Sequence, residues 1–264
     1  MSIVGSSISQ LCTMLKIIMT HPPLRVQSLS DSGITEIPKR YVKPPKDRPI
    51  SSKACRNCGF FQVVNHGVPP ELMDQAREVW REFFHKPMKM KQCYANSPKT
   101  YEGYGSRLAV EKGVILDWSD YYFLHYLPCS FKDHQQWPAL PVSLREVIEE
   151  FSKQVMNFGG HLMKVLSANL GLRENYLENA FGGGEDIGAC LRVNFYPKCP
   201  QPDLTLGLSP HSNPGGLTFL LPDQHLAGLQ VRRNSNWITV KPAPHAFTNS
   251  VRYNYLGRRR PVFD

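Results

Sequence analysis

The stretch Gly188-Ala-Cys-Leu-Arg-Val-Asn-Phe-Tyr196 decides the fold class of this chain. Its residues follow the period of two that places successive side chains of a β-strand on opposite faces. Leu191 and Val193 fall on one face, and Arg192 and Asn194 fall on the other. The segment therefore predicts a strand with one apolar face toward a core and one polar face that can line a site.

Short strands are predicted on the C-terminal side of this segment. Residues 217–221, 229–232 and 237–241 are rich in apolar and β-branched residues, and Gly, Pro and Asn separate them. Short strands at close spacing are typical of an antiparallel sheet.

Two helices are predicted on the N-terminal side. The first begins at Pro70, a residue suited to a first helical turn, and ends before Pro87. The second begins at Ser143, which forms a capping-box pattern with Glu146, and it ends at Gly171. Apolar residues recur in both at steps of three and four, so each helix is expected to bury one face.

The order of these elements predicts an α+β fold. Apart from one apolar strand within residues 59–67, helices come first and short strands follow. This order favours an antiparallel β core with an N-terminal helical layer, and a double-sheet jelly roll is one candidate for that core.

The composition excludes several classes of protein. Of 264 residues, 41% are hydrophobic and 20% are charged, which excludes a wholly disordered chain, a collagen-like fibre and a coiled coil. No stretch approaches the roughly 18 apolar residues of a membrane span. The net charge of +9 is scattered, apart from four arginines near the C-terminus. We therefore expect no nucleic-acid partner, no membrane and a cytoplasmic location; the small-molecule partner that we expect follows from the family resemblance described below.

Seven cysteines are spread along the chain, and Cys55 and Cys58 form the one close pair. A single Cys-x-x-Cys is a weak zinc or redox signal because a structural zinc ion needs four ligands. Reduced thiols in a cytosolic protein are the simpler interpretation.

The run Leu208-Ser-Pro-His-Ser-Asn-Pro-Gly-Gly216 holds two candidate metal ligands, His211 and Asn213. On a strand, two residues two positions apart project to the same side. A His-x-Asp pair with a distant His forms the facial triad of non-haem Fe(II) oxygenases. The spacing alone also fits a solvent-exposed histidine with no metal.

Several motifs resemble those of the plant 2-oxoglutarate/Fe(II)-dependent dioxygenases. They occur in the family's order over roughly residues 53–247, and the segments 101–106 and 117–125 are most similar to the jasmonate-induced oxygenase branch. The motifs are Gly59-Phe-Phe-Gln-Val-Val-Asn-His-Gly67, Arg192-Val-Asn-Phe-Tyr-Pro-Lys-Cys-Pro200, Leu208-Ser-Pro-His-Ser-Asn-Pro-Gly-Gly216, Gly228-Leu-Gln-Val231 and Trp237-Ile-Thr-Val-Lys-Pro242.

The resemblance implies a jelly-roll core that binds Fe(II), with 2-oxoglutarate as co-substrate and O₂ as oxidant. It implies that His211 is the first iron ligand and that Tyr196 contacts the co-substrate. Asn194 lies on the same face as Tyr196. Arg192, on that face too, is a candidate anchor for an anionic substrate or co-substrate, because guanidinium pairs with carboxylate as a planar fork.

The sequence departs from the family pattern at the metal site. Asn213 stands where the family has its Asp ligand, and an amide oxygen lacks the negative charge of a carboxylate. The family's distal His is expected near position 265 or beyond, so neither it nor the family's Arg-x-Ser pair has a counterpart before the last residue, Asp264. Catalysis would need a substitute ligand from His225, from His245 or from a partner chain. We therefore expect an incomplete jelly roll and an impaired iron site.

These patterns predict four regions: a poorly ordered leader over residues 1–52, a mostly helical dioxygenase N-terminal region over 53–170, a partial jelly roll over 171–247 and an atypical basic tail over 248–264. The predicted activity is oxidation of a small, carboxylated plant metabolite such as a jasmonate-type or flavonoid-type compound. The alternative is a non-catalytic truncated variant, or an interaction protein without iron chemistry.

Overall fold

A computed structural model describes residues 10–18, 59–96, 100–105, 117–200, 204–211, 213, 215–233 and 236–251. The helices are α3 (Pro70–His85), α4 (Met88–Gln92), α5 (Leu144–Asn169) and α6 (Tyr176–Ala180), with short 3-10 turns η3 (Cys129–Phe131), η4 (His134–Gln136) and η5 (Gly184–Asp186). The strands are β1 (Gln10–Ile18), β2 (Phe60–Val63), β3 (Gly103–Gly105), β4 (Asp120–Leu127), β5 (Gly188–Tyr196), β6 (Leu217–Leu221), β7 (Gln230–Arg233), β8 (Asn236–Thr239) and β9 (Phe247–Val251).

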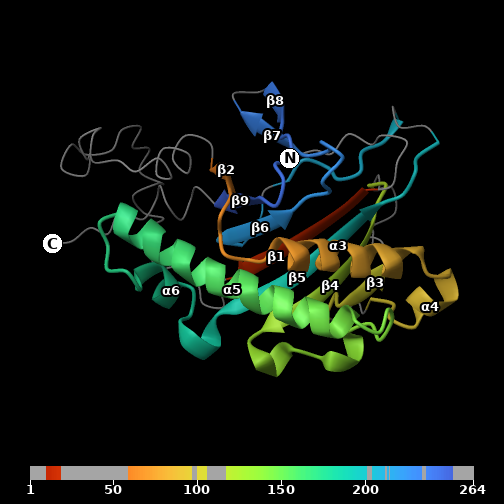
Figure 1. The fold of residues 1–264 in the computed structure, drawn as a ribbon, viewed down its shortest axis with the longest axis horizontal. Coiled ribbons are helices and arrows are strands. Elements are labelled where there is room, and N and C mark those ends of the chain that lie inside the picture. Colours follow the sequence, from red (N-terminus) through yellow and green to blue (C-terminus); the bar gives the residue numbers. More distant parts are fainter. Residues whose placement is uncertain are drawn as a thin grey trace.

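One sheet dominates the fold. Its seven strands lie in the order β2-β9-β6-β1-β5-β4-β3, and every neighbouring pair is antiparallel. Strands β7 and β8 form a separate two-stranded sheet, drawn in blue above the large sheet (Figure 1). The prediction of an α+β fold with antiparallel sheets is confirmed.

Helices α3 and α5 cover one face of the large sheet (Figure 1). Their apolar faces meet side chains from β4, β5, β6 and β9 in one core. Trp80 is fully buried there, and Phe83 packs edge-on against Tyr122 with ring centroids 5.1 Å apart. An aromatic pair of this kind contributes about 0.5–1.5 kcal/mol beyond the area that it buries.

The predicted helix ends are confirmed, but the predicted capping box is wrong. Helix α3 begins at Pro70, and Gly171 takes a φ of +74° beyond the end of α5. Ser143 precedes α5 without a side-chain hydrogen bond to the helix. Its carbonyl instead accepts the amide of Val147 at 3.0 Å, and Leu144 donates its amide to the Pro141 carbonyl at 2.9 Å.

Strand β1 is the main departure from the sequence prediction. Residues 10–18 fall inside the leader that was expected to be poorly ordered, yet they form a nine-residue strand at the centre of the sheet. Thr13–Ile17 pair with β5 on one side and with β6 on the other. Leu15 lies opposite both Leu191 and Phe219. Strand β1 therefore joins two halves of the sheet, β2-β9-β6 and β5-β4-β3.

The predicted C-terminal tail also begins inside the sheet. Strand β9 includes residues 248–251 and pairs with both β2 and β6. Residues 252–264, with the four arginines, lie outside the described residues, as do Cys55 and Cys58. Four cysteines whose side chains the structure describes, Cys93, Cys129, Cys190 and Cys199, are free thiols. Within the described part of the chain, no helix is long and apolar enough to cross a membrane.

A proline in the middle of β1 tests its role. Leu15→Pro removes a backbone N–H from a strand that has partners on both sides, and a proline is not accommodated in a central strand. We expect the free energy of unfolding to fall by at least about 1–3 kcal/mol, the cost of one unmade buried hydrogen bond. Chemical denaturation followed by circular dichroism measures this loss.

Two controls accompany that variant. Leu15→Ala keeps the backbone N–H, and Ile238→Pro places a proline in the two-stranded sheet, where Ile238 is 49% exposed and water can replace a lost bond. Equal losses for Leu15→Pro and Ile238→Pro would contradict the central position of β1.

Candidate functional site

Strand β5 presents the three predicted cofactor-site residues on the sheet face that lies opposite the helices. Leu191 and Val193 belong to the core beneath the helices. Arg192, Asn194 and Tyr196 alternate with them, so they lie on the other face. Asn194 is 2% exposed, Tyr196 is 4% exposed and Arg192 is half-buried. One strand therefore brings these three residues together, as the sequence predicts.

Arg192 is held by neighbours on two strands. Its Nε donates to the side-chain oxygen of Asn194 at 2.9 Å. Its guanidinium lies over the ring of Tyr121 in β4, 4.1 Å from the centroid. Tyr121 is 6% exposed and lies directly opposite Asn194 in the ladder between β4 and β5.

The candidate metal ligands follow on the connection from β5 to β6. The two side chains would project to the same side on a strand, but neither His211 nor Asn213 lies in one. His211 is exposed, and its Nδ1 is 2.9 Å from the Ser209 carbonyl. The Ser209 hydroxyl donates a short hydrogen bond to the Asp117 carboxylate. The chain before β4 therefore steadies the loop that carries His211.

The side-chain oxygen of Asn213 is an unsatisfied hydrogen-bond acceptor among the described residues. This oxygen is buried and has no hydrogen-bond partner among the described residues. A buried polar atom without a partner costs about 1–3 kcal/mol, so such an atom is a natural place for a ligand to bind.

The described residues do not supply a complete Fe(II) site. They contain no group of three His, Cys, Asp or Glu side chains placed to hold a metal ion. The candidate ligands within the motif itself are one imidazole and one neutral amide oxygen. Carboxylate oxygens suit a hard divalent ion better because they carry negative charge. The donor set therefore fits the iron site of the resembling family only in part.

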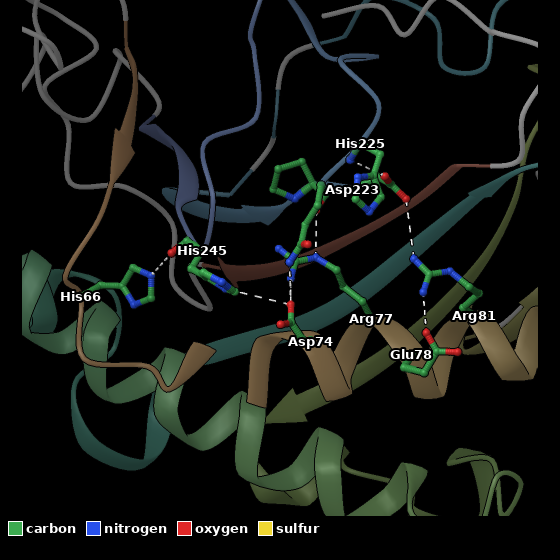
Figure 2. Close-up of polar contacts among 10 residues, drawn as sticks. His66, Asp74, Arg77, Glu78, Arg81, Asp223, His225 and His245 are labelled. Atoms are coloured by element: carbon green, nitrogen blue, oxygen red, sulfur yellow. Dashed lines mark hydrogen bonds and ion pairs between the residues drawn. The ribbon is translucent and has the colours of Figure 1, made fainter. Parts of the chain in front are cut away.

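The two histidines considered as substitute ligands belong to a different polar network, which surrounds α3 (Figure 2). His245 Nδ1 lies 4.0 Å from Asp74 in α3. The backbone N–H of His225 donates to Asp223 at 2.9 Å, and Asp223 lies 3.8 Å from Arg81. These contacts connect both histidines to α3 and not to the loop that carries His211.

Arg77 is the centre of this network. It is 6% exposed, bonds Asp74 at 2.7 Å and donates from Nε to the Pro222 carbonyl at 3.1 Å. Burial lowers the pKa of the Arg77 guanidinium, while the Asp74 and Asp223 carboxylates act in the opposite direction. Gln224 also donates to Asp74 at 2.6 Å. The network connects the loop after β6 to α3, and so it holds the C-terminal end of β6 in the large sheet against this helix.

His66 completes the network in one defined tautomer. The Val68 backbone N–H donates to His66 Nδ1 at 3.2 Å, so Nε2 carries the proton and donates to the His245 carbonyl at 2.9 Å. The His66 ring also packs on Phe247, with centroids 4.7 Å apart. Burial lowers the pKa of His66, and the charge of His245 lowers it further, against the opposing hydrogen bond.

Sequence reasoning missed Tyr121, the Ser209–Asp117 pair and the role of His66. Tyr121 lies in a motif that was used only for the branch resemblance. Its contact with Arg192 depends on the register between β4 and β5, which no local pattern reveals.

Comparisons with known proteins identify the family of this chain. The model of the non-haem dioxygenase in morphine synthesis N-terminal region matches residues 52–140, and the model of the 2OG-Fe(II) oxygenase superfamily matches residues 187–254. Jasmonate-induced oxygenase 3 of Arabidopsis thaliana is 56% identical over 263 residues, which cover 86% of this chain and 72% of that protein. Leucoanthocyanidin dioxygenase of Malus domestica is 34% identical over 86% of this chain and 74% of that protein.

A solved structure of a 2-oxoglutarate-binding oxygenase also matches this chain. The crystal structure of JOX2 in complex with 2OG, Fe and JA has a TM-score of 0.73 to this chain at 56% identity. The match covers 89% of this chain and 74% of that one. The chain spans 66–73% of the length of the four jasmonate-induced oxygenases that it matches.

The tautomer of His66 predicts an acid-sensitive fold. Because its folded-state pKa lies below the ordinary value of 6.5, its contribution to stability is complete above pH 6.5 and is lost as the pH falls below that value. We expect the free energy of unfolding to decline between pH 7 and pH 5, and His66→Asn to reduce that decline. Denaturation curves across this range measure it. An unchanged pH slope in the variant would show that other groups cause the decline.

Proposed function

The chain belongs to the 2OG-Fe(II) oxygenase superfamily, and from that premise we propose that it binds a small carboxylated metabolite at the polar face of β5 but holds iron weakly. The proposed substrate class is a jasmonate-type or flavonoid-type compound, and the proposed ancestral reaction is its oxidation. One observation carries the proposal. Tyr121 and Asn194 hold the guanidinium of Arg192, while the candidate metal ligands His211 and Asn213 include no carboxylate.

Arg192 supports the carboxylate part of this proposal. A guanidinium presents a rigid fork of N–H donors that matches a carboxylate, and it does so best where its surroundings already fix its orientation. Tyr121 and Asn194 lie on the same face of the large sheet as Arg192, and both contact it. The similar structure of JOX2 is a complex with 2OG, Fe and JA, which supports a small-molecule ligand of that class for this chain.

His211, Asn213 and Tyr196 support the cofactor part. In this proposal His211 and the Asn213 amide oxygen are what remains of the iron site, and Tyr196 contacts 2-oxoglutarate. Bound Fe(II) with 2-oxoglutarate would activate O₂ for oxidation of the metabolite. Without a carboxylate in the donor set, we propose that iron affinity, and with it catalysis, is impaired.

The division of the chain follows from the same proposal. We propose that residues 53–170, which contain the long helices α3 and α5, are the dioxygenase N-terminal region. We propose that residues 171–247, which contain β5 to β8, contribute an incomplete jelly roll. The alternative function, a non-catalytic binding protein, would keep the Arg192 face without iron chemistry. It would be distinguished by ligand affinity that does not change when Fe(II) is removed.

Asn213→Asp tests the proposed weakness of the iron site. The change restores a negatively charged oxygen where the orphaned amide oxygen lies, so we expect Fe(II) affinity to rise about tenfold or more, which corresponds to at least about 1.4 kcal/mol. Anaerobic titration of the purified chain with Fe(II), with and without 2-oxoglutarate, measures this change. The visible charge-transfer band of an iron–2-oxoglutarate complex gives a second reading.

Asn213→Leu is the matched control because it keeps the size of the side chain and removes the oxygen. It should lower whatever residual affinity the chain has. Stoichiometric, tight Fe(II) binding by the unaltered chain, with the band present and no gain in Asn213→Asp, would show that the proposed impairment is wrong.

A further inference from the structure

The support of Arg192 begins in the register of two strands. In the ladder between β4 and β5, Tyr121 lies opposite Asn194, and Phe123 lies opposite Arg192. Tyr121 is therefore the diagonal neighbour of Arg192, a distance that aromatic and long side chains can span. This register, and not proximity along the chain, puts the ring beneath the guanidinium.

Two different contacts fix the guanidinium. The hydrogen bond from Nε to Asn194 at 2.9 Å defines the direction of the side chain. The Tyr121 ring, 4.1 Å from the guanidinium carbon, restricts its plane through cation–π attraction. Both partners are buried, with 2% of Asn194 and 6% of Tyr121 exposed, so they have little freedom to move away.

A second layer of contacts fixes the tyrosine. Asn96 donates from Nδ2 to the Tyr121 hydroxyl at 2.9 Å, and its backbone N–H donates to the Tyr104 carbonyl at 2.8 Å. Gly105 leaves room for that amide, because a Cβ at Gly105 would lie only 2.7 Å from the Asn96 side chain. The support therefore extends from β3 to β5.

We infer that Tyr121 and Asn194 are positioning residues, which orient the guanidinium of Arg192 for the carboxylate of an acidic ligand. This inference rests on the proposed function. Arginine has many side-chain conformations, and ordering them on binding reduces affinity. When the unliganded protein already holds the guanidinium in one orientation, the ligand carboxylate meets a preformed fork.

The first test examines the unliganded full chain by NMR. The Nε–H resonance of Arg192, assigned by its loss in Arg192→Lys, should be displaced by the ring current of Tyr121. Tyr121→Phe keeps the ring and should keep this displacement, whereas Tyr121→Leu should abolish it. An unchanged resonance in Tyr121→Leu would overturn the inference without any reference to a ligand.

The second test measures binding of jasmonic acid and of its methyl ester by calorimetry. Tyr121→Leu should weaken binding of the acid by about 3- to 30-fold, the range expected for one cation–π contact, and leave binding of the ester unchanged. Tyr121→Phe keeps the ring and loses only the hydroxyl that accepts from Asn96, so it should bind the acid more tightly than Tyr121→Leu does. Asn194→Leu should weaken binding of the acid, and Asn194→Asp, which keeps the acceptor, should restore it.

The comparison of acid with ester separates positioning from general stability, because a merely destabilised site would lose both ligands together. If Arg192→Ala loses the preference for the acid but Tyr121→Leu and Asn194→Leu keep it, the inference is wrong and the proposed carboxylate site stands. If the unaltered chain binds acid and ester equally while the ring-current displacement is present, the proposed carboxylate site is wrong, and so is the role inferred here.

Discussion

The double-sided pairing of β1 is the constraint on which the rest of the structure depends. Strands β5 and β6 do not pair with each other, and β1 satisfies the backbone groups of both. All five residues of β6, and all but two of the nine in β5, are buried, so unpaired amides there would be costly. A segment from one end of the chain thus makes a continuous sheet from elements that lie far along the sequence.

The two faces of this continuous sheet differ in the side chains that they carry. The face under α3 and α5 is apolar and aromatic, and it contributes most of the buried core. The opposite face carries Arg192, Asn194 and Tyr196 with a small apolar cluster that includes Leu220 and Leu229. The polar network around Arg77 connects the helical layer to the loop after β6, so it holds α3 in place against that end of the sheet.

The two parts of the candidate site differ in how their side chains are held and in the charge that they offer a ligand. Arg192 is held by a stacked neighbour and a hydrogen-bonded neighbour, whereas the candidate metal ligands are one imidazole and one neutral amide oxygen. Replacing a carboxylate with an amide changes the charge of a donor without a large change in its shape. Such a substitution can leave the fold and the ligand-binding face intact while it weakens the hold on a divalent ion.

Local patterns in the sequence were sufficient for the elements whose periodicity is strong. The bounds of β5 and β6, the start of α3 and the left-handed glycine at the end of α5 were all predictable, because they depend on alternation, proline and glycine. The hydrogen bonds around Ser143 were not, since its backbone takes a helical conformation in which the side chain makes no cap.

The sequence by itself determined the family, the polar face of β5 and the missing carboxylate at Asn213, because these are properties of residue type and spacing. Only the tertiary structure decided that residues 10–18 enter the sheet, that Tyr121 lies beneath Arg192 and that His245 contacts α3. Each of these depends on pairing between segments far apart in the chain. The free energy of such a pairing comes from the partner strand or helix and not from the local pattern of either segment.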